Sequence, residues 1–168
     1  MSQPIELIDP PRIAEWAWRS LERGADDPRH AMHLLTLATT GVDGRPSARL
    51  MTNRGADRVS GRLWFYTRTD VPKVADLKAS PWVCVMGYDA AAGVQVRVFG
   101  QASVHTGDQL SEQHWAHVAS VAKWLYEAAA EAGPSPAGVD PRFPLDRAKL
   151  TAGLSKRSRA RFGAIEVK

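Results

Sequence analysis

The stretch Gly41–Arg54, GVDGRPSARLMTNR, decides the fold that this sequence predicts. Its first half supplies the Gly, Asp and Pro residues of a tight hairpin turn, and Ser47–Asn53 then has the pattern of a half-buried strand. That strand carries Arg49 at its middle and is followed by Arg54. A cation is costly in a half-buried strand unless something negative lies opposite. The stretch therefore predicts an antiparallel hairpin and a nearby anion.

The rest of the chain predicts a helix, a series of strands, two more helices and a last strand. The first helix is expected from an Asp9 cap to about Gly24. The expected strands are His33–Thr40, Ser47–Asn53, Arg62–Thr69, Trp82–Tyr88 and Val94–Val104, and Val71–Ala79 is expected to be a short helix. Short loops between these strands favour a mainly β, mostly antiparallel barrel of six to seven strands with peripheral helices over a parallel doubly wound sheet.

Length and composition set the remaining expectations. A chain of 168 residues fits a single domain, with a barrel core at about 33–106, a helical segment at 108–132 and a final strand at 161–168. We expect a cytoplasmic protein, because no apolar run approaches the ~18 to 20 residues of a membrane span and the amino terminus lacks a signal-peptide core. The formal net charge of +4 favours anionic ligands without specifying their class.

Strand periodicity suggests which side chains leave the core. Alternation in the hairpin strand separates one set, Ala48, Leu50 and Thr52, from another, Ser47, Arg49, Met51 and Asn53. We expect the set with Arg49 to face outward. In Val94–Gly100, three valines likewise oppose Gln95, Arg97 and Phe99. Such faces would suit a flat ligand with polar edges and a charged tail, although a solvated sheet face is the alternative for any single arginine.

Four consecutive segments carry a family resemblance. TLATTGVDGRPSARLMTNR, LWFYTRTDVPK, SPWVCVMGY and VQVRVFGQASV resemble, in order and spacing, the flavin-binding split β-barrels related to pyridoxamine 5'-phosphate oxidase. The resemblance covers about Leu34–Thr106. It implies a homodimer that binds flavin mononucleotide (FMN) between its subunits. It also implies an oxidoreductase with an unassigned substrate, in which the flavin carries the chemistry.

The resemblance also assigns cofactor-binding residues. Arg49 and Lys73 match the residues that hold the FMN phosphate, and Gln95 matches a glutamine that contacts the flavin ring. The other matched positions line the ring and the rest of the cofactor: Leu50, Met51, Thr52, Arg54, Tyr66 and Thr67. No catalytic acid or base and no metal ligand is assigned.

Some positions depart from the oxidase pattern. Pro72 stands where the family often has an arginine that binds phosphate, and whether Arg68 compensates is open. Arg54 stands where the oxidases usually carry a lysine near the substrate. The sequence stops at Lys168, whereas in the oxidases the last strand leads to a tail with Trp and Arg. We therefore expect little or no pyridoxamine 5'-phosphate oxidase activity.

Other functions stay open at this stage. The alternatives are a non-catalytic flavin-binding or regulatory module, a split barrel that binds F420 or haem, and a basic barrel that binds nucleic acid. His114 and His117 have a spacing that could place both imidazoles on one metal, but packing is the expected role. The basic segment Lys156–Arg161 could bind nucleic acid or phosphate, and a solvated surface is the plainer interpretation.

Overall fold

A computed structural model describes residues 10–119, 123, 126 and 156–168 of the protein. The chain divides into two compact units. The barrel unit comprises Met1–Thr67, Val71–Val104 and Ala164–Lys168, and the helical unit comprises Arg68–Asp70 and His105–Gly163. A single domain over residues 1–168 stays a prediction.

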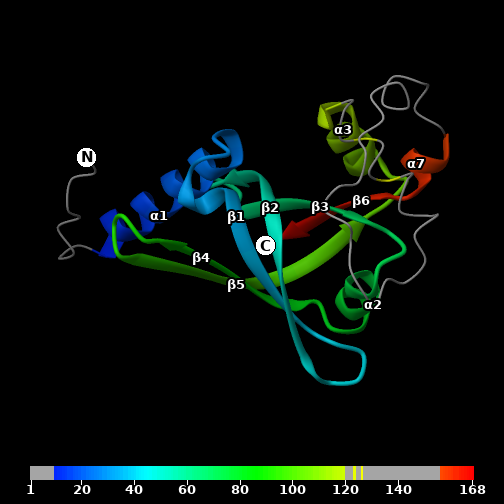
Figure 1. The fold of residues 1–168 in the computed structure, drawn as a ribbon, viewed down its shortest axis with the longest axis horizontal. Coiled ribbons are helices and arrows are strands. Elements are labelled where there is room, and N and C mark those ends of the chain that lie inside the picture. Colours follow the sequence, from blue (N-terminus) through cyan, green and yellow to red (C-terminus); the bar gives the residue numbers. More distant parts are fainter. Residues whose placement is uncertain (1–9, 120–122, 124–125, 127–155) are drawn as a thin grey trace, which may run out of the picture. The chain divides into compact units, whose positions relative to one another are not determined.

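Six strands close into a barrel, within the predicted range of six to seven (Figure 1). They are β1 (Leu34–Thr40), β2 (Pro46–Asp57), β3 (Arg62–Arg68), β4 (Trp82–Asp89), β5 (Val94–His105) and β6 (Phe162–Val167). Their order around the barrel is β1-β2-β3-β6-β5-β4, and β1 pairs antiparallel with both β2 and β4. This architecture confirms the predicted mainly β class. Strand β2 continues to Asp57, beyond its predicted end at Asn53.

The described helices are α1 (Pro10–Asp26), the 3-10 helix η1 (Ala31–His33), α2 (Pro72–Ala79), α3 (Gln109–His117) and α7 (Lys156–Ala160). Asp108 caps α3, but the helix ends at His117, and most of the helical segment predicted to continue to residue 132 lies outside the described residues. The predicted Asp9 cap of α1 also lies outside them. None of the helices in the described part of the chain is long and apolar enough to cross a membrane.

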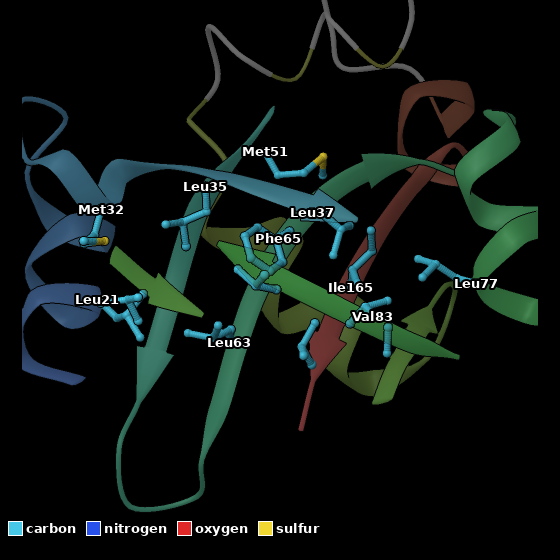
Figure 2. Close-up of a cluster of buried hydrophobic side chains, with 14 residues drawn as sticks. Leu21, Met32, Leu35, Leu37, Met51, Leu63, Phe65, Leu77, Val83 and Ile165 are labelled. Carbon is cyan, nitrogen blue, oxygen red and sulfur yellow. The ribbon is translucent and has the colours of Figure 1, made fainter. Parts of the chain in front are cut away.

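The barrel encloses one apolar core. Figure 2 shows leucine, methionine, phenylalanine, valine and isoleucine side chains converging between the strands. Leu35, Leu37, Leu63 and Phe65 are completely buried. Burial of this kind, worth about 25 cal/mol per Å² of apolar surface, is the main stabilising contribution to the barrel.

One polar residue is fully buried in this core and has partners for its amide. Asn53 of β2 donates through Nδ2 to the carbonyl oxygens of Leu21 (2.7 Å) and Met32 (3.2 Å), and its Oδ1 accepts from the Gly55 amide (3.2 Å). Because a buried amide is stable only when it is hydrogen-bonded, these bonds fix α1 and η1 against β2.

The predicted orientation of β2 is wrong. Met51 is 6% exposed and Asn53 is fully buried, whereas Leu50 is 67% exposed, so the face that carries Arg49 is the core face. Pairing with β1 is the reason, since Arg49 lies opposite Leu37, which is in the core. Three of the side chains on this inner face, Ser47, Arg49 and Asn53, are polar, and the sequence therefore predicted that the face is exposed to solvent. The prediction for β5 is confirmed, because Phe99 is 66% exposed.

Candidate functional site

Arg49 is held in place by neighbouring groups of the β1–β2 hairpin. Its Nη1 donates to the Leu37 carbonyl oxygen (3.2 Å) and to Thr39 Oγ1 (2.8 Å), and its Nη2 donates to Ser47 Oγ (2.7 Å). The side chain is only 20% exposed. The hairpin therefore presents a partly desolvated guanidinium whose orientation is fixed before any ligand arrives.

Lys73 brings a second cation to this region. It lies in the first turn of α2, and its Nζ contacts Thr67 Oγ1 at 3.4 Å. Burial, and then the positive charge of Arg49, lower the pKa of Lys73 below its usual value. No side chain caps the amino end of α2, where backbone N–H groups favour negative charge.

One carboxylate lies beside these cations. Asp76 is on α2, and its Oδ2 is 3.9 Å from Arg49 Nη2. Its Oδ1 accepts from the backbone amide of Val42, in the turn between β1 and β2, at 3.3 Å. We call Arg49, Lys73 and the hydroxyls of Thr39, Ser47 and Thr67 the cation cluster. Two positive charges face one negative charge here, so the cluster suits an additional anion.

The predicted site residues fall into two groups. Arg49, Thr67 and Lys73 come together in the cation cluster, and Met51 is buried on the same inner face of β2 as Arg49. The others lie on the outer surface of the barrel, where Leu50, Arg54 and Gln95 are exposed and Thr52 and Tyr66 are half-buried.

Within the outer group, Arg54 lies over the ring of Tyr66, with the guanidinium carbon 5.6 Å from the ring centroid. Burial raises the pKa of the Tyr66 phenol. This pair continues the outer surface of β2 onto β3.

Gln95 is not brought next to Arg49 within the chain. Strands β1 and β4 lie between β2 and β5 in the order of strands around the barrel. Its Nε2 contacts Met86 Sδ at 2.9 Å. The role of Gln95 stays a prediction.

Sequence reasoning missed three members of this site: Thr39, Ser47 and Asp76. The hairpin register places Thr39 opposite Ser47, two residues from Arg49 along β2, so the turn alone could have indicated both hydroxyls. Asp76 follows Lys73 by one helical turn, a spacing that brings side chains together.

In the helical unit, the basic segment is engaged in internal contacts. Arg159 forms an ion pair with Glu112 and packs against Trp115 and Phe162. This arginine is 19% exposed, so the solvated surface proposed for the segment does not describe it.

Arg68, the possible substitute for the missing phosphate donor, binds Asp70 through two hydrogen bonds of 2.8 and 2.7 Å. His117 Nδ1 lies 2.8 Å from the Gln113 carbonyl oxygen. In the described ranges, no three His, Cys, Asp or Glu side chains are grouped as a metal site would require.

Comparison with known proteins identifies the family. The family model described as pyridoxamine 5'-phosphate oxidase matches residues 25–139. The chain belongs to this family. A pyridoxine/pyridoxamine 5'-phosphate oxidase of Burkholderia multivorans is 34% identical over 82 residues, which is 49% of this chain and 37% of that protein. The homologue from Granulibacter bethesdensis is 33% identical over 106 residues, 60% of this chain and 48% of that protein. These matches span less than half the length of both relatives.

Solved structures share the fold. PhzG of Burkholderia lata, crystallised with tetrahydrophenazine-1-carboxylic acid, is 21% identical and superposes with a TM-score of 0.67 over 99% of this chain and 83% of its own. A pyridoxamine 5'-phosphate oxidase-related, FMN-binding protein of Nostoc punctiforme is 20% identical, with a TM-score of 0.65 over 96% of this chain and 81% of its own. These likenesses extend the split-barrel fold of the family to this chain.

Proposed function

We propose that this protein binds FMN and uses it in an oxidation or reduction of a small molecule that is not yet assigned. The observation that carries the proposal is the cation cluster. Arg49 and Lys73 are close enough for the charge of Arg49 to lower the pKa of Lys73, and Asp76 lies 3.9 Å from Arg49 as a counter-charge. A phosphomonoester, which carries nearly two negative charges at neutral pH, would relieve this imbalance.

The family and the fold support this choice of ligand. The chain belongs to the pyridoxamine 5'-phosphate oxidase family, and the Nostoc protein of the same fold is described as FMN-binding. The donors present here also fit the group: two cations, three hydroxyls and the uncapped amino end of a helix can together hold a phosphate.

The chain's own residues would bind and orient the cofactor. Arg49 and Lys73 would hold the phosphate, and the outer surface formed by Leu50, Thr52 and Tyr66 would lie along the ring. Bound flavin supplies the capacity to accept or donate a hydride or an electron pair. The protein would contribute position and electrostatics, and we assign no catalytic acid or base.

The proposal predicts a strong preference for FMN over riboflavin. Because the two differ only in the phosphate, and charge-assisted hydrogen bonds contribute roughly 1.5–3 kcal/mol each, FMN should bind at least about tenfold more tightly. Titration of the purified protein with each flavin, followed by fluorescence quenching, measures both affinities. Equal affinities would rule out the phosphate assignment, and binding of neither would rule out the proposed function.

We also propose a homodimer in which two copies meet through the outer surface of the sheet β2–β1–β4–β5. Large apolar side chains are exposed on this surface: Leu34, Leu50, Trp82, Tyr88 and Phe99 are 53–67% exposed. Strand register aligns Ala48, Ala38, Cys84 and Phe99 in one row across it. A large exposed apolar patch is a common sign of an interface.

A charged residue in this surface should prevent association. Phe99→Asp is expected to convert a dimer into a monomer, because two buried, unpaired carboxylates would face the interface. Light scattering coupled to size exclusion measures the mass. Val59→Asp is the matched control, since Val59 is 93% exposed in the turn between β2 and β3, and it should leave the mass unchanged. A wild-type monomer would refute the interface.

The reaction itself needs a direct assay. Anaerobic reduction of the flavin-loaded protein by nicotinamide cofactors distinguishes an oxidoreductase from a non-catalytic flavin-binding module. Weak oxidation of pyridoxamine 5'-phosphate stays a prediction. The presence of Arg54 in place of the expected lysine supports this prediction of weak activity, because a planar guanidinium does not reproduce the contacts of a lysine ammonium.

A further inference from the structure

Asp76 has no ligand-binding role in the function proposed so far, although it is an acidic side chain beside the proposed phosphate site. Its carboxylate is 11% exposed and lies 3.9 Å from the Arg49 guanidinium. Water screens a charge poorly at that level of burial, so the carboxylate acts on every charge in its vicinity. The question is whether it positions Arg49 or sets the charge of the site.

The contacts of Arg49 argue against a positioning role. Three hydrogen bonds of 2.7–3.2 Å, to Leu37, Thr39 and Ser47, already orient the guanidinium. The separation of 3.9 Å from Asp76 exceeds hydrogen-bond length. Asp76 therefore acts on Arg49 through charge and adds little to its orientation.

This charge has opposite effects in the two states of the site. Without a ligand, the carboxylate faces the partly desolvated Arg49 guanidinium and so lowers the net positive charge of the cation cluster. With a phosphate bound, the same carboxylate faces another anion across Arg49 and repels it. Burial of Asp76 makes both effects larger than they would be on the surface.

We propose that Asp76 is a built-in counter-charge that stabilises the ligand-free cation cluster and limits its affinity for a phosphomonoester. The inference rests on the proposed function, because it requires a phosphate at Arg49 and Lys73. It makes Asp76 a determinant of how tightly this protein retains the phosphate of its cofactor.

Asp76→Asn tests the inference, since asparagine has nearly the same shape and can still accept from the Val42 amide. The variant should bind FMN about tenfold more tightly than wild type, with riboflavin affinity unchanged. Without ligand it should melt at a lower temperature, and inorganic phosphate should raise its melting temperature by more than that of wild type. Asp43→Asn is the matched control, because this carboxylate lies in the β1–β2 turn with Val42 and is 58% exposed. It should change neither the flavin affinities nor the melting temperatures.

The outcomes separate the two proposals. If wild type does not prefer FMN to riboflavin, the proposed function fails and this inference fails with it. If wild type does prefer FMN, but Asp76→Asn binds it equally or more weakly, only the counter-charge is refuted, and weaker binding would indicate a positioning role instead. Should the single variant fold poorly, the change is made in a Lys73→Gln background, where one of the repelling cations is gone. Tighter FMN binding there supports the inference, and unchanged or weaker binding overturns it.

Discussion

Replacing Arg49 with alanine is expected to weaken FMN binding about tenfold to a hundredfold. The guanidinium is only 20% exposed and is already oriented by Thr39 and Ser47, so its hydrogen bonds to a phosphate would form without much ordering cost. Loss of a charge-assisted hydrogen bond of roughly 1.5–3 kcal/mol gives this range. Flavin fluorescence titrations of the wild type and the variant measure it.

Two comparisons show whether the loss is specific to the phosphate. Riboflavin affinity should stay within about twofold of wild type in the variant, because riboflavin has no group for Arg49 to bind. Arg45→Ala is the matched control: Arg45 lies in the turn that precedes β2, its side chain is 86% exposed, and it pairs with Asp43. An equal loss of FMN affinity in the two variants would point to general charge attraction, and no loss in Arg49→Ala would remove Arg49 from the site.

The barrel could be predicted from the sequence because its turns are local. The first hairpin turn contains Gly44, whose φ of 78° is readily adopted by glycine, and the flanking β-rich segments pair across it. The end of α3 at His117 could not be predicted in the same way, because the helical spacing of apolar residues continues beyond it. Local pattern therefore predicted which segments are strands, but it placed the ends of β2 and α3 wrongly.

The cofactor-binding roles of the matched residues stay predictions, and the predicted orientation of β2 was wrong. Arg49, Thr67 and Lys73 were matched through the family resemblance, and they lie together in the structure. Alternation shows only which residues share a face, and the side that is buried depends on pairing with β1. Asn53 illustrates the difficulty, since a polar residue favours the outside until its buried partners are known.

A large loss of stability is expected from Gly24→Ala in α1. A methyl group at this position would lie 2.3 Å from the backbone carbon and oxygen of Met32, and backbone atoms cannot move aside as a side chain can. The helix gains up to about 1 kcal/mol from alanine, but displacing η1 also strains the bond between His33 Nδ1 and the Gly24 carbonyl oxygen, which is 2.7 Å long. We expect a net loss of about 3 kcal/mol in the free energy of unfolding, measured by urea denaturation. Gly44→Ala is the control, since nothing lies within 4 Å of its methyl position and only the positive φ opposes the change, at about 1 kcal/mol. Equal losses in the two variants would show that the close packing of α1 on η1 does not limit this position.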